Sequence, residues 1–219
     1  MLELILPAGV ESEERFGEAP GGVLLPEEEK IIAHAMEPRR REYAAVRSCA
    51  RVCLGRLGYG PVPILPGVGG APIWPAGVAG SMTHCTGYAA AAVAPRPRIS
   101  AVGIDAEPDA PLPDGVLELV ATAAERDRLT ATWPEPDGPN WDRLLFSAKE
   151  AVYKAWFPLV GEWLDHQEAE ILINPQDRTF EAQLSRDGLI VHGRQIRRLP
   201  GRWIRKRGTL ITAVVLGSA

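Results

Sequence analysis

The sequence of 219 residues has few cysteines, few aromatic residues and no long apolar segment. Its three cysteines are too few and uneven for a disulfide framework, which predicts a reducing, cytoplasmic location. No apolar run approaches the ~20 residues that a membrane span needs, and the N-terminus lacks the features of a signal peptide. A formal net charge of -4 argues against a general nucleic-acid-binding protein. The sequence therefore excludes the secreted, membrane-spanning and fibrous classes.

Glycine and proline, in contrast, are abundant. The 22 Gly and 20 Pro make up nearly a fifth of the chain, which indicates either disorder or long loops. They are densest between Gly60 and Gly80, where we expect a loop with one short strand at Ala71–Trp74. The remaining composition, 46% hydrophobic and 24% charged, is that of a globular protein with a sizeable core.

Apolar periodicity predicts an α+β fold with helices and sequential strands. Helices are expected at Pro26 to about Ala35, Arg39–Leu57, Val116–Leu129 and from Asn140 or Asp142 to Trp156. Strands are expected at Ala89–Ala94, Ile99–Ile104, Ala169–Ile173, Thr179–Leu184 and Gly188–Val191, with a hairpin of Trp203–Ile204 and Leu210–Leu216 around Arg207-Gly208. Two passes of helix followed by strands, before and after about residue 105, indicate two similar halves.

Two acidic residues, Asp105 and Glu107, end the strand predicted at Ile99. Side chains alternate along an extended chain, so both carboxylates project to the same face. Close carboxylates repel each other unless a cation lies between them, and one or two carboxylates are the usual protein ligands of Mg²⁺. Acidic residues are also common at solvated strand ends, so the spacing alone leaves this second interpretation open beside the metal site.

The helix ending at Trp156 carries a lysine and glutamate pattern on an aromatic stripe. Phe146, Glu150, Tyr153, Lys154 and Phe157 share one side on a 3.6-residue period. Glu150 and Lys154 are either an ordinary surface ion pair or functional groups recessed among aromatic rings. Lys149 is turned away by one position and could reach another part of the same ligand.

A polar segment, Gly80 to Tyr88, precedes the alanine-rich strand and contains Ser81, Thr83 and His84. A serine and a histidine suggest a hydrolase, although the G-x-S-x-G elbow and an acidic partner are missing. The alternative is that His84 is a packed, hydrogen-bonded histidine near the start of a strand.

Taken together, three motifs resemble the Sfp/EntD-type 4′-phosphopantetheinyl transferases, most closely the actinobacterial branch. They are Gly80-Ser81-x-Thr83-His84, Gly103-Ile-Asp105-Ala-Glu107 and Phe146-Ser-x-Lys149-Glu150-Ala-x-x-Lys154-Ala. Their order and spacing match from about Arg39 onward. The resemblance implies a monomer of two similar α/β halves related by a pseudo-twofold, residues 1–105 and 106–219, with coenzyme A in the cleft between them.

The resemblance also implies an activity. Such enzymes transfer the 4′-phosphopantetheine arm of coenzyme A to a serine of apo acyl or peptidyl carrier proteins and release 3′,5′-ADP. They serve polyketide, nonribosomal peptide, siderophore, antibiotic or fatty acid synthesis. Asp105, Glu107 and Glu150 would hold Mg²⁺ or Mn²⁺, and Glu150 would take the proton of the carrier serine.

The same resemblance assigns the anion contacts. Lys154 and Lys149 would stabilise the departing phosphate. His84, in the loop that also contains Ser81 and Thr83, would contact the 3′-phosphate of coenzyme A. The nucleotide phosphates would be held by three arginines of the helix predicted at Arg39–Leu57, which are Arg39, Arg40 and Arg47.

One departure from the family pattern concerns the loop from Pro66 to Trp74. Relatives often carry a basic residue there, whereas this loop contains no Lys or Arg. The 3′-phosphate contact is therefore expected to depend on the helix arginines and His84. Two other functions stay open: a Mg²⁺-dependent hydrolase of a coenzyme-A-like diphosphate, and a non-catalytic nucleotide-binding module.

Overall fold

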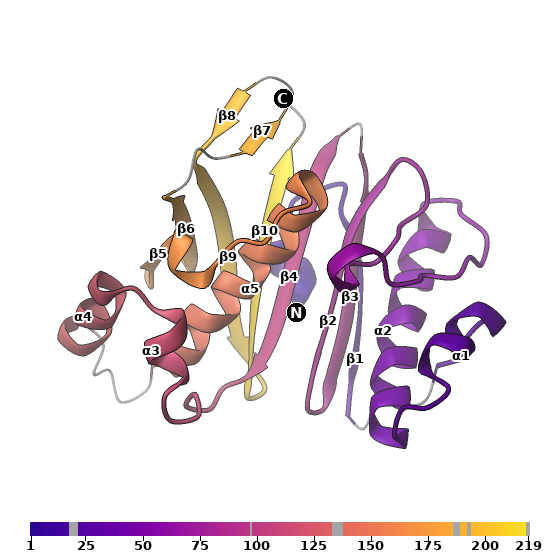
Figure 1. The fold of residues 1–219 in the computed structure, drawn as a ribbon, viewed down its shortest axis with the longest axis horizontal. Helices are drawn as coiled ribbons and strands as arrows, with labels where there is room; N and C mark the ends of the chain where they lie inside the picture. The colour runs from indigo at the N-terminus through magenta and orange to yellow at the C-terminus, as the bar shows by residue number, and fades with distance from the viewer. Residues whose placement is uncertain (18–21, 97, 133–137, 186–188, 192–193, 218–219) are drawn as a thin grey trace.

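The protein folds into two antiparallel sheets that lie side by side, each covered by one long helix (Figure 1). The computed structural model describes residues 1–17, 22–96, 98–132, 138–185, 189–191 and 194–217. The first sheet has the strand order β1-β3-β2 and the second the order β4-β10-β9-β6-β5. A separate two-stranded ribbon, β7-β8, completes the strands. The mixture of helix and strand agrees with the predicted class.

The elements have the following bounds. The strands are β1 Glu11–Phe16, β2 Val78–Cys85, β3 Tyr88–Pro95, β4 Ile99–Pro108, β5 Ala169–Asn174, β6 Thr179–Leu184, β7 Leu189–Val191, β8 Arg194–Ile196, β9 Arg198–Lys206 and β10 Thr209–Gly217. The α-helices are α1 Pro26–Ile32, α2 Glu37–Arg56, α3 Val116–Val120, α4 Ala123–Thr132 and α5 Trp141–Val160. Short 3₁₀ helices are η1 Leu2–Ile5, η2 Val68–Gly70 and η3 His166–Glu168.

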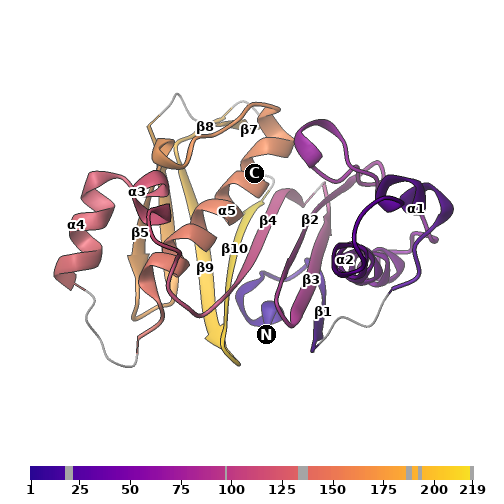
Figure 2. The same ribbon diagram turned by 60° about the horizontal axis from the view of Figure 1, so that its bottom comes forward.

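Helix α2 covers the first sheet and α5 covers the second (Figure 2). The buried face of α2 places small and branched side chains, Cys53 and Leu54 among them, against Ala91 and Val93 of β3. α5 lies so close to β4 that a Cβ atom on Gly103 would lie 2.0 Å from the carbonyl oxygen of Ala151. The absence of a side chain at Gly103 therefore allows α5 to pack this closely against β4.

Hydroxyl groups connect the two sheets where β2 and β4 run side by side (Figures 1 and 2). Neither strand forms a backbone ladder with the other, because each belongs to a different sheet. Instead, the amide of Ile104 donates to Ser81 Oγ at 3.1 Å and the amide of Ala106 donates to Thr83 Oγ1 at 3.0 Å. Side chains of β2 thus satisfy backbone donors of β4, which a buried edge strand requires.

Several predicted elements are confirmed. Helices α1, α2 and α5 occur where the apolar periodicity placed them, and β6 has the predicted bounds. The predicted C-terminal hairpin is present as β9 and β10, and its turn residues Arg207 and Gly208 both have positive φ angles. Gly188, at the start of one predicted strand, lies outside the described residues.

Other predictions were wrong. Ala71–Trp74 is not a strand, and Pro72 forms only an isolated bridge with Pro66. The helix expected at Val116–Leu129 is two helices, because Thr122 and Glu125 form a capping box that starts α4 anew. Strands β1, β2 and β8 were not predicted.

The predicted neighbours β3 and β4 do not pair with each other. β3 lies between β1 and β2, whereas β4 pairs with β10 from Ile99 to Pro108. The boundary proposed after Asp105 therefore falls inside β4, and the change of sheet comes between Pro95 and Ile99.

All three cysteines are free thiols. Among the residues that the structure describes, no helix has both the length and the apolar character needed to cross a membrane.

Candidate active site

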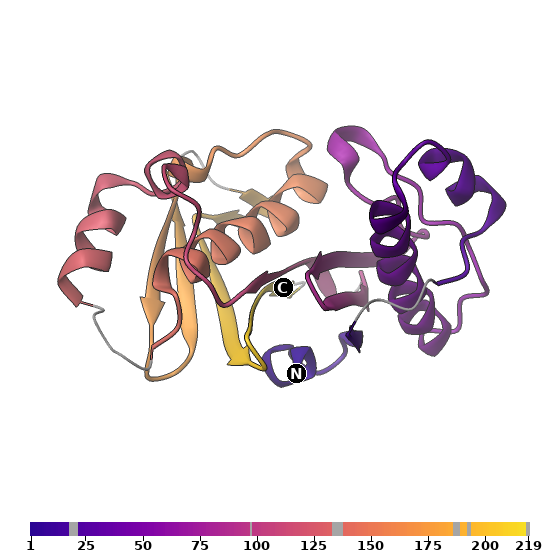
Figure 3. The same cartoon turned by 90° about the horizontal axis from the view of Figure 1, so that it is seen from below.

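A cavity of about 490 Å³ lies between α2 and α5, above the edge where the two sheets meet. Figure 3 shows the two helices on either side of this region. Its polar lining comes from Arg39, Tyr43 and Arg47 of α2, Ser81 of β2, and Glu150, Tyr153 and Lys154 of α5. The loop around η2 contributes glycine and proline, and Phe157 adds an aromatic ring to the lining.

The α2 wall is cationic. Arg39, Tyr43 and Arg47 are spaced four residues apart and therefore lie on one stripe of the helix. The buried Arg47 donates from Nε to the carbonyl oxygen of Ile64 at 2.9 Å and stacks over the Tyr43 ring. Burial lowers the pKa of Arg47 to about 10, so it remains charged at neutral pH.

Tyr43 has a hydroxyl group that is buried without a hydrogen-bond partner among the described residues. Burial raises the pKa of Tyr43, so the group is a neutral donor. A buried donor without an acceptor is costly, and a ligand in the cavity could supply the missing acceptor.

Only two of the three arginines that were expected to hold the nucleotide phosphates line the cavity. Arg39 and Arg47 line it, but Arg40 donates to the carbonyl oxygen of Ile32 at 3.0 Å and does not. Arg51 pairs with the buried Glu28 at 2.7 Å instead. The prediction of Arg40 as a nucleotide contact is therefore not supported, because its guanidinium holds the end of α1.

The two β4 carboxylates are close to basic side chains. Asp105 Oδ1 accepts from Lys154 Nζ at 2.7 Å and from Thr83 Oγ1 at 3.4 Å, while Oδ2 is buried without a partner among the described residues. Glu107 pairs with Arg143 at 2.9 Å. Burial and the charge of Asp105 raise the pKa of Glu107, as expected for two carboxylates on one face of a strand.

Glu150 faces the cavity from α5. Its Oε1 atom lies 3.0 Å from His166 Nε2. Burial alone would raise the pKa of Glu150, but the hydrogen bond to His166 and the charge of Lys154 outweigh it and lower the pKa. The carboxylate is therefore ionised at neutral pH. Lys154 makes its ion pair with Asp105, so the simple surface pair considered from the sequence is not what the structure forms.

The three acidic residues provide only oxygen donors, which suits a hard divalent cation. Asp105 Oδ2 has no hydrogen-bond partner among the described residues, and burial together with the charge of Asp105 raises the pKa of Glu107. Each carboxylate has a basic partner: Asp105 pairs with Lys154, Glu107 with Arg143 and Glu150 with His166. Among the described residues, no three acidic, His or Cys side chains already form a cluster able to hold a metal ion. The donor chemistry fits a metal. Binding it requires Lys154 and Arg143 to give up their ion pairs, whereas His166 contacts only Oε1 of Glu150 and leaves Oε2 available.

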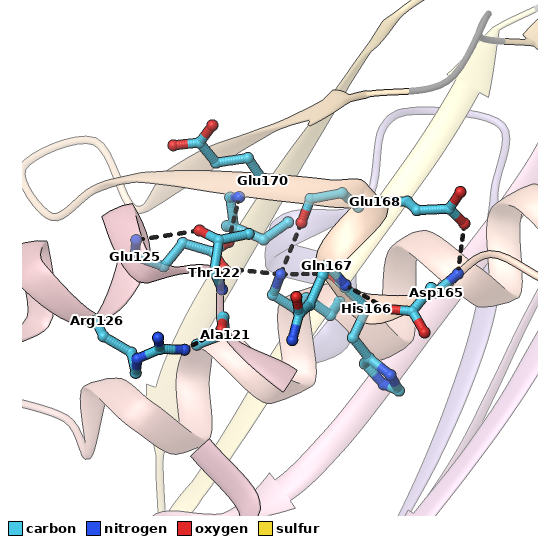
Figure 4. A network of polar contacts seen from close by, with 12 residues as sticks. Ala121, Thr122, Glu125, Arg126, Asp165, His166, Gln167, Glu168 and Glu170 are labelled. Atoms are coloured by element: carbon cyan, nitrogen blue, oxygen red, sulfur yellow. Dashed lines mark hydrogen bonds and ion pairs between the residues drawn. The ribbon is translucent and has the colours of Figure 1, made fainter. Parts of the chain in front are cut away.

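Lys149 lies away from the cavity, contrary to prediction. Its ammonium is buried, pairs with Glu125 at 2.9 Å and donates to the carbonyl oxygens of His166 and Ala169 at 2.6 and 2.7 Å. Figure 4 shows Glu125 and the Asp165–Glu168 turn that surround these contacts. One helical position rotates a side chain by about 100°, which turns Lys149 from the cavity into the core.

The hydroxyl groups of Ser81 and Thr83 are engaged in the seam between β2 and β4. Ser81 still lines the cavity, whereas Thr83 does not. Both residues therefore have a structural role that the sequence did not indicate.

His84 lies beside the cavity rather than in its lining. Its Nε2 atom is 2.9 Å from Arg39 Nη1, and Nδ1 is 3.7 Å from the Glu42 carboxylate. Burial lowers the pKa of His84, which favours a neutral ring that accepts from Arg39. Ser81 instead receives its hydrogen bond from a backbone amide, so the structure does not pair serine and histidine as a hydrolase would.

Sequence reasoning missed three residues of this region. Tyr43 was not considered as a site residue, although its spacing from Arg39 and Arg47 places it on the cavity stripe. His166 and Arg143 carry no local signal, because their partners Glu150 and Glu107 are brought close only by the fold.

Two family models match the chain, one on each side of the cavity. The model for the 4′-phosphopantetheinyl transferase N-terminal domain matches residues 27–94, which include α2 and β2. The model for the 4′-phosphopantetheinyl transferase superfamily matches residues 101–198, which include the acidic end of β4 and α5.

Curated proteins from three actinobacteria are similar over nearly the whole chain. The 4′-phosphopantetheinyl transferase Svp of Streptomyces mobaraensis is 47% identical, covering 100% of this chain and 90% of the relative. The 4′-phosphopantetheinyl transferase PptT of Mycobacterium tuberculosis is 43% identical, covering 97% and 96%. The 4′-phosphopantetheinyl transferase Npt of Nocardia iowensis is 45% identical, covering 98% and 99%.

Proposed function

Because the chain belongs to the 4′-phosphopantetheinyl transferase superfamily, we propose that it transfers the phosphopantetheine arm of coenzyme A to a serine of acyl or peptidyl carrier proteins. The observation that carries this proposal is the cavity between α2 and α5, with two arginines on one wall and an ionised carboxylate on the other. Such a cavity suits an anionic substrate that must meet a hydroxyl nucleophile.

Coenzyme A would lie between the two halves of the molecule. Each half consists of a 20-residue helix on an antiparallel sheet, which supports the pseudo-twofold relation implied by the resemblance. Arg39 and Arg47 would hold the nucleotide phosphates, with His84 beside Arg39. The hydroxyl group of Tyr43 would donate to the same ligand. These contacts replace the basic residue that the loop around η2 lacks.

The reaction needs a base for the carrier serine. Glu150 lines the cavity, is ionised and has one carboxylate oxygen, Oε2, that makes no hydrogen bond among the described residues. It would take the serine proton while the serine oxygen bonds to the phosphorus that carries the pantetheine arm. The bond from that phosphorus to the bridging oxygen breaks, and 3′,5′-ADP leaves. Lys154 would neutralise negative charge at the phosphates.

A divalent cation would be held by Asp105, Glu107 and Glu150. When bound, it supplies positive charge that stabilises the pyrophosphate oxygens during transfer. We propose Mg²⁺, with Mn²⁺ able to substitute because it prefers the same oxygen ligands. Lys154, which lines the cavity, would then turn from Asp105 toward the substrate phosphates. We propose that the enzyme acts as a monomer, since both cavity walls come from one chain.

The test is to incubate the protein with coenzyme A, Mg²⁺ and a purified apo carrier domain, and to weigh the carrier by mass spectrometry. We expect the carrier to gain one phosphopantetheine arm on its serine. Asp105→Ala should abolish the gain, whereas Glu118→Gln, an exposed change on α3, should leave it intact. Cleavage of coenzyme A without a carrier would indicate the hydrolase instead, and no gain with several carrier types would refute the proposal.

A further inference from the structure

The turn after α5 places a histidine directly behind the proposed catalytic base. His166 Nε2 lies 3.0 Å from Glu150 Oε1, and its ring stacks on Phe146 with centroids 6.1 Å apart and planes 14° from parallel. Since an ionised carboxylate only accepts hydrogen bonds, Nε2 must be the donor. We propose that His166 is a positioning residue that holds the Glu150 carboxylate for proton transfer, an inference that rests on the proposed function.

The backbone around His166 is held by two sets of hydrogen bonds. The amide of Gln167 donates to Asp165 Oδ1 at 2.9 Å and the amide of Asp165 donates to Glu168 Oε2 at 2.9 Å, which forms a capping box around η3. Lys149 binds the carbonyl oxygens on both sides of this turn, at His166 and Ala169. These hydrogen bonds therefore fix the backbone from which the His166 side chain extends toward Glu150.

Lys149 is itself anchored by Glu125. The Glu125 carboxylate accepts from Lys149, from the amide of Thr122 at 2.7 Å and from the amide of Ile171 at 2.7 Å (Figure 4). These contacts join α4, α5 and β5 at one buried point. The lysine of the Lys-Glu motif thus acts on its neighbour Glu150 indirectly, by fixing the turn that presents His166.

The hydrogen bond from His166 occupies one oxygen of Glu150 and leaves the other for the substrate. A glutamate side chain has three rotatable bonds, so a carboxylate at the cavity wall needs a second contact to keep one orientation. Outer contacts of this kind are worth 10-fold to 100-fold in activity when removed. His166 affects the placement of Glu150 without touching coenzyme A, since it does not line the cavity.

A matched pair of variants tests this role. In His166→Gln the amide nitrogen can still donate to Glu150, while His166→Met has a side chain of the same length without a donor. We expect His166→Met to lower kcat about 10-fold to 100-fold with an unchanged KM for coenzyme A. His166→Gln should stay within about threefold of the wild type. Binding of 3′,5′-ADP by calorimetry and the Tm should be the same in all three proteins.

Two outcomes overturn the inference: wild-type kcat in His166→Met, or an equal loss in both variants. The wild type and Glu150→Gln are measured alongside to separate this from the proposed function. Suppose that the wild type modifies the carrier, that Glu150→Gln fails to modify it, and that His166→Met modifies it at the wild-type rate. In that case only the positioning role of His166 is refuted. If the wild type modifies no carrier, the proposed function fails, and the inference fails with it.

Discussion

Helices α2 and α5 have the same length and line opposite walls of one cavity, but they present different chemistry to it. α2 contributes the cations Arg39 and Arg47 and the hydroxyl group of Tyr43, whereas α5 contributes the carboxylate of Glu150 beside Lys154. The α2 wall can hold an anion, and the α5 wall can move a proton.

The two walls are also supported differently. Arg47 donates to the backbone carbonyl oxygens of Ile64 and Tyr43 and stacks over the Tyr43 ring of its own helix. Glu150 and Lys154 are each held by a side chain from another element, respectively His166 and Asp105. We infer that binding and chemistry are separable here: changes on α2 should act on KM, and changes on α5 on kcat.

The largest effect is expected from Glu150→Gln, which keeps the shape of the side chain and removes the base. Loss of a general base lowers turnover about a thousand-fold. Steady-state kinetics with coenzyme A and an apo carrier should show this loss in kcat. Unchanged binding of 3′,5′-ADP would show that the α2 wall remains intact; a variant that retained wild-type kcat would contradict the assignment of Glu150 as base.

A second prediction compares ion pairs on the two helices. Lys149→Met leaves Glu125 buried and unpaired, which should lower the free energy of unfolding by about 3–5 kcal/mol. Arg41→Met removes an exposed pair with Glu37 on α2 and should cost less than about 1 kcal/mol. Urea unfolding measures both. Similar losses in the two variants would show that the Lys149 pair is not the buried anchor that the structure indicates.

On α2, Arg39→Ala should raise the KM for coenzyme A about tenfold, because a charged hydrogen bond to phosphate is lost. The kcat should stay within about twofold of the wild type if the walls are separable. Arg39 is a cleaner target than Arg47, whose removal would also leave the Ile64 carbonyl oxygen unpaired. Arg41→Ala, on the same helix but outside the cavity lining, is the control. A loss in kcat with an unchanged KM would contradict the inference that α2 acts on binding and α5 on chemistry.

The smallest effect is expected from Tyr43→Phe. It removes the only atom of the side chain that we propose contacts the ligand, so the KM for coenzyme A should rise about threefold. The Tm should not fall, since the hydroxyl group has no hydrogen-bond partner among the residues that the structure describes. A scan of thermal unfolding with and without coenzyme A separates the two effects. A lower Tm without ligand would mean that the hydroxyl group stabilises the fold instead.

The parts predicted correctly from the sequence are those specified by local periodicity. Alternation along β4 put Asp105 and Glu107 on one face, and the helical period put Glu150 and Lys154 on the side of α5 that lines the cavity. Both arguments need only neighbouring residues. The family resemblance, based on the same segments, is confirmed by the matches over nearly the whole chain.

The parts that failed depend on contacts between distant segments. Lys149 was expected at the ligand, but its partner Glu125 lies in another helix that was itself predicted as part of a longer one. Strand β1 was missed because its residues are almost all polar, and it is held by pairing with β3 and by contacts such as Glu13 with Arg56. The reason for Gly103 also depends on a distant segment, because the missing side chain lets helix α5 approach β4.

The position of β10 has a consequence for how the enzyme is made. This strand lies between β4 and β9 in the second sheet, pairs with β4 along its length, and places Thr212 opposite Asp105. Thr212 also donates to the carbonyl oxygen of Ser147 on α5. All proposed site residues leave the ribosome before the strand that joins their two supports. A nascent or proteolysed chain that ends before Thr209 therefore contains each of these residues but lacks the strand that assembles the site. During synthesis, activity is expected only after β10 has left the ribosome and paired with β4.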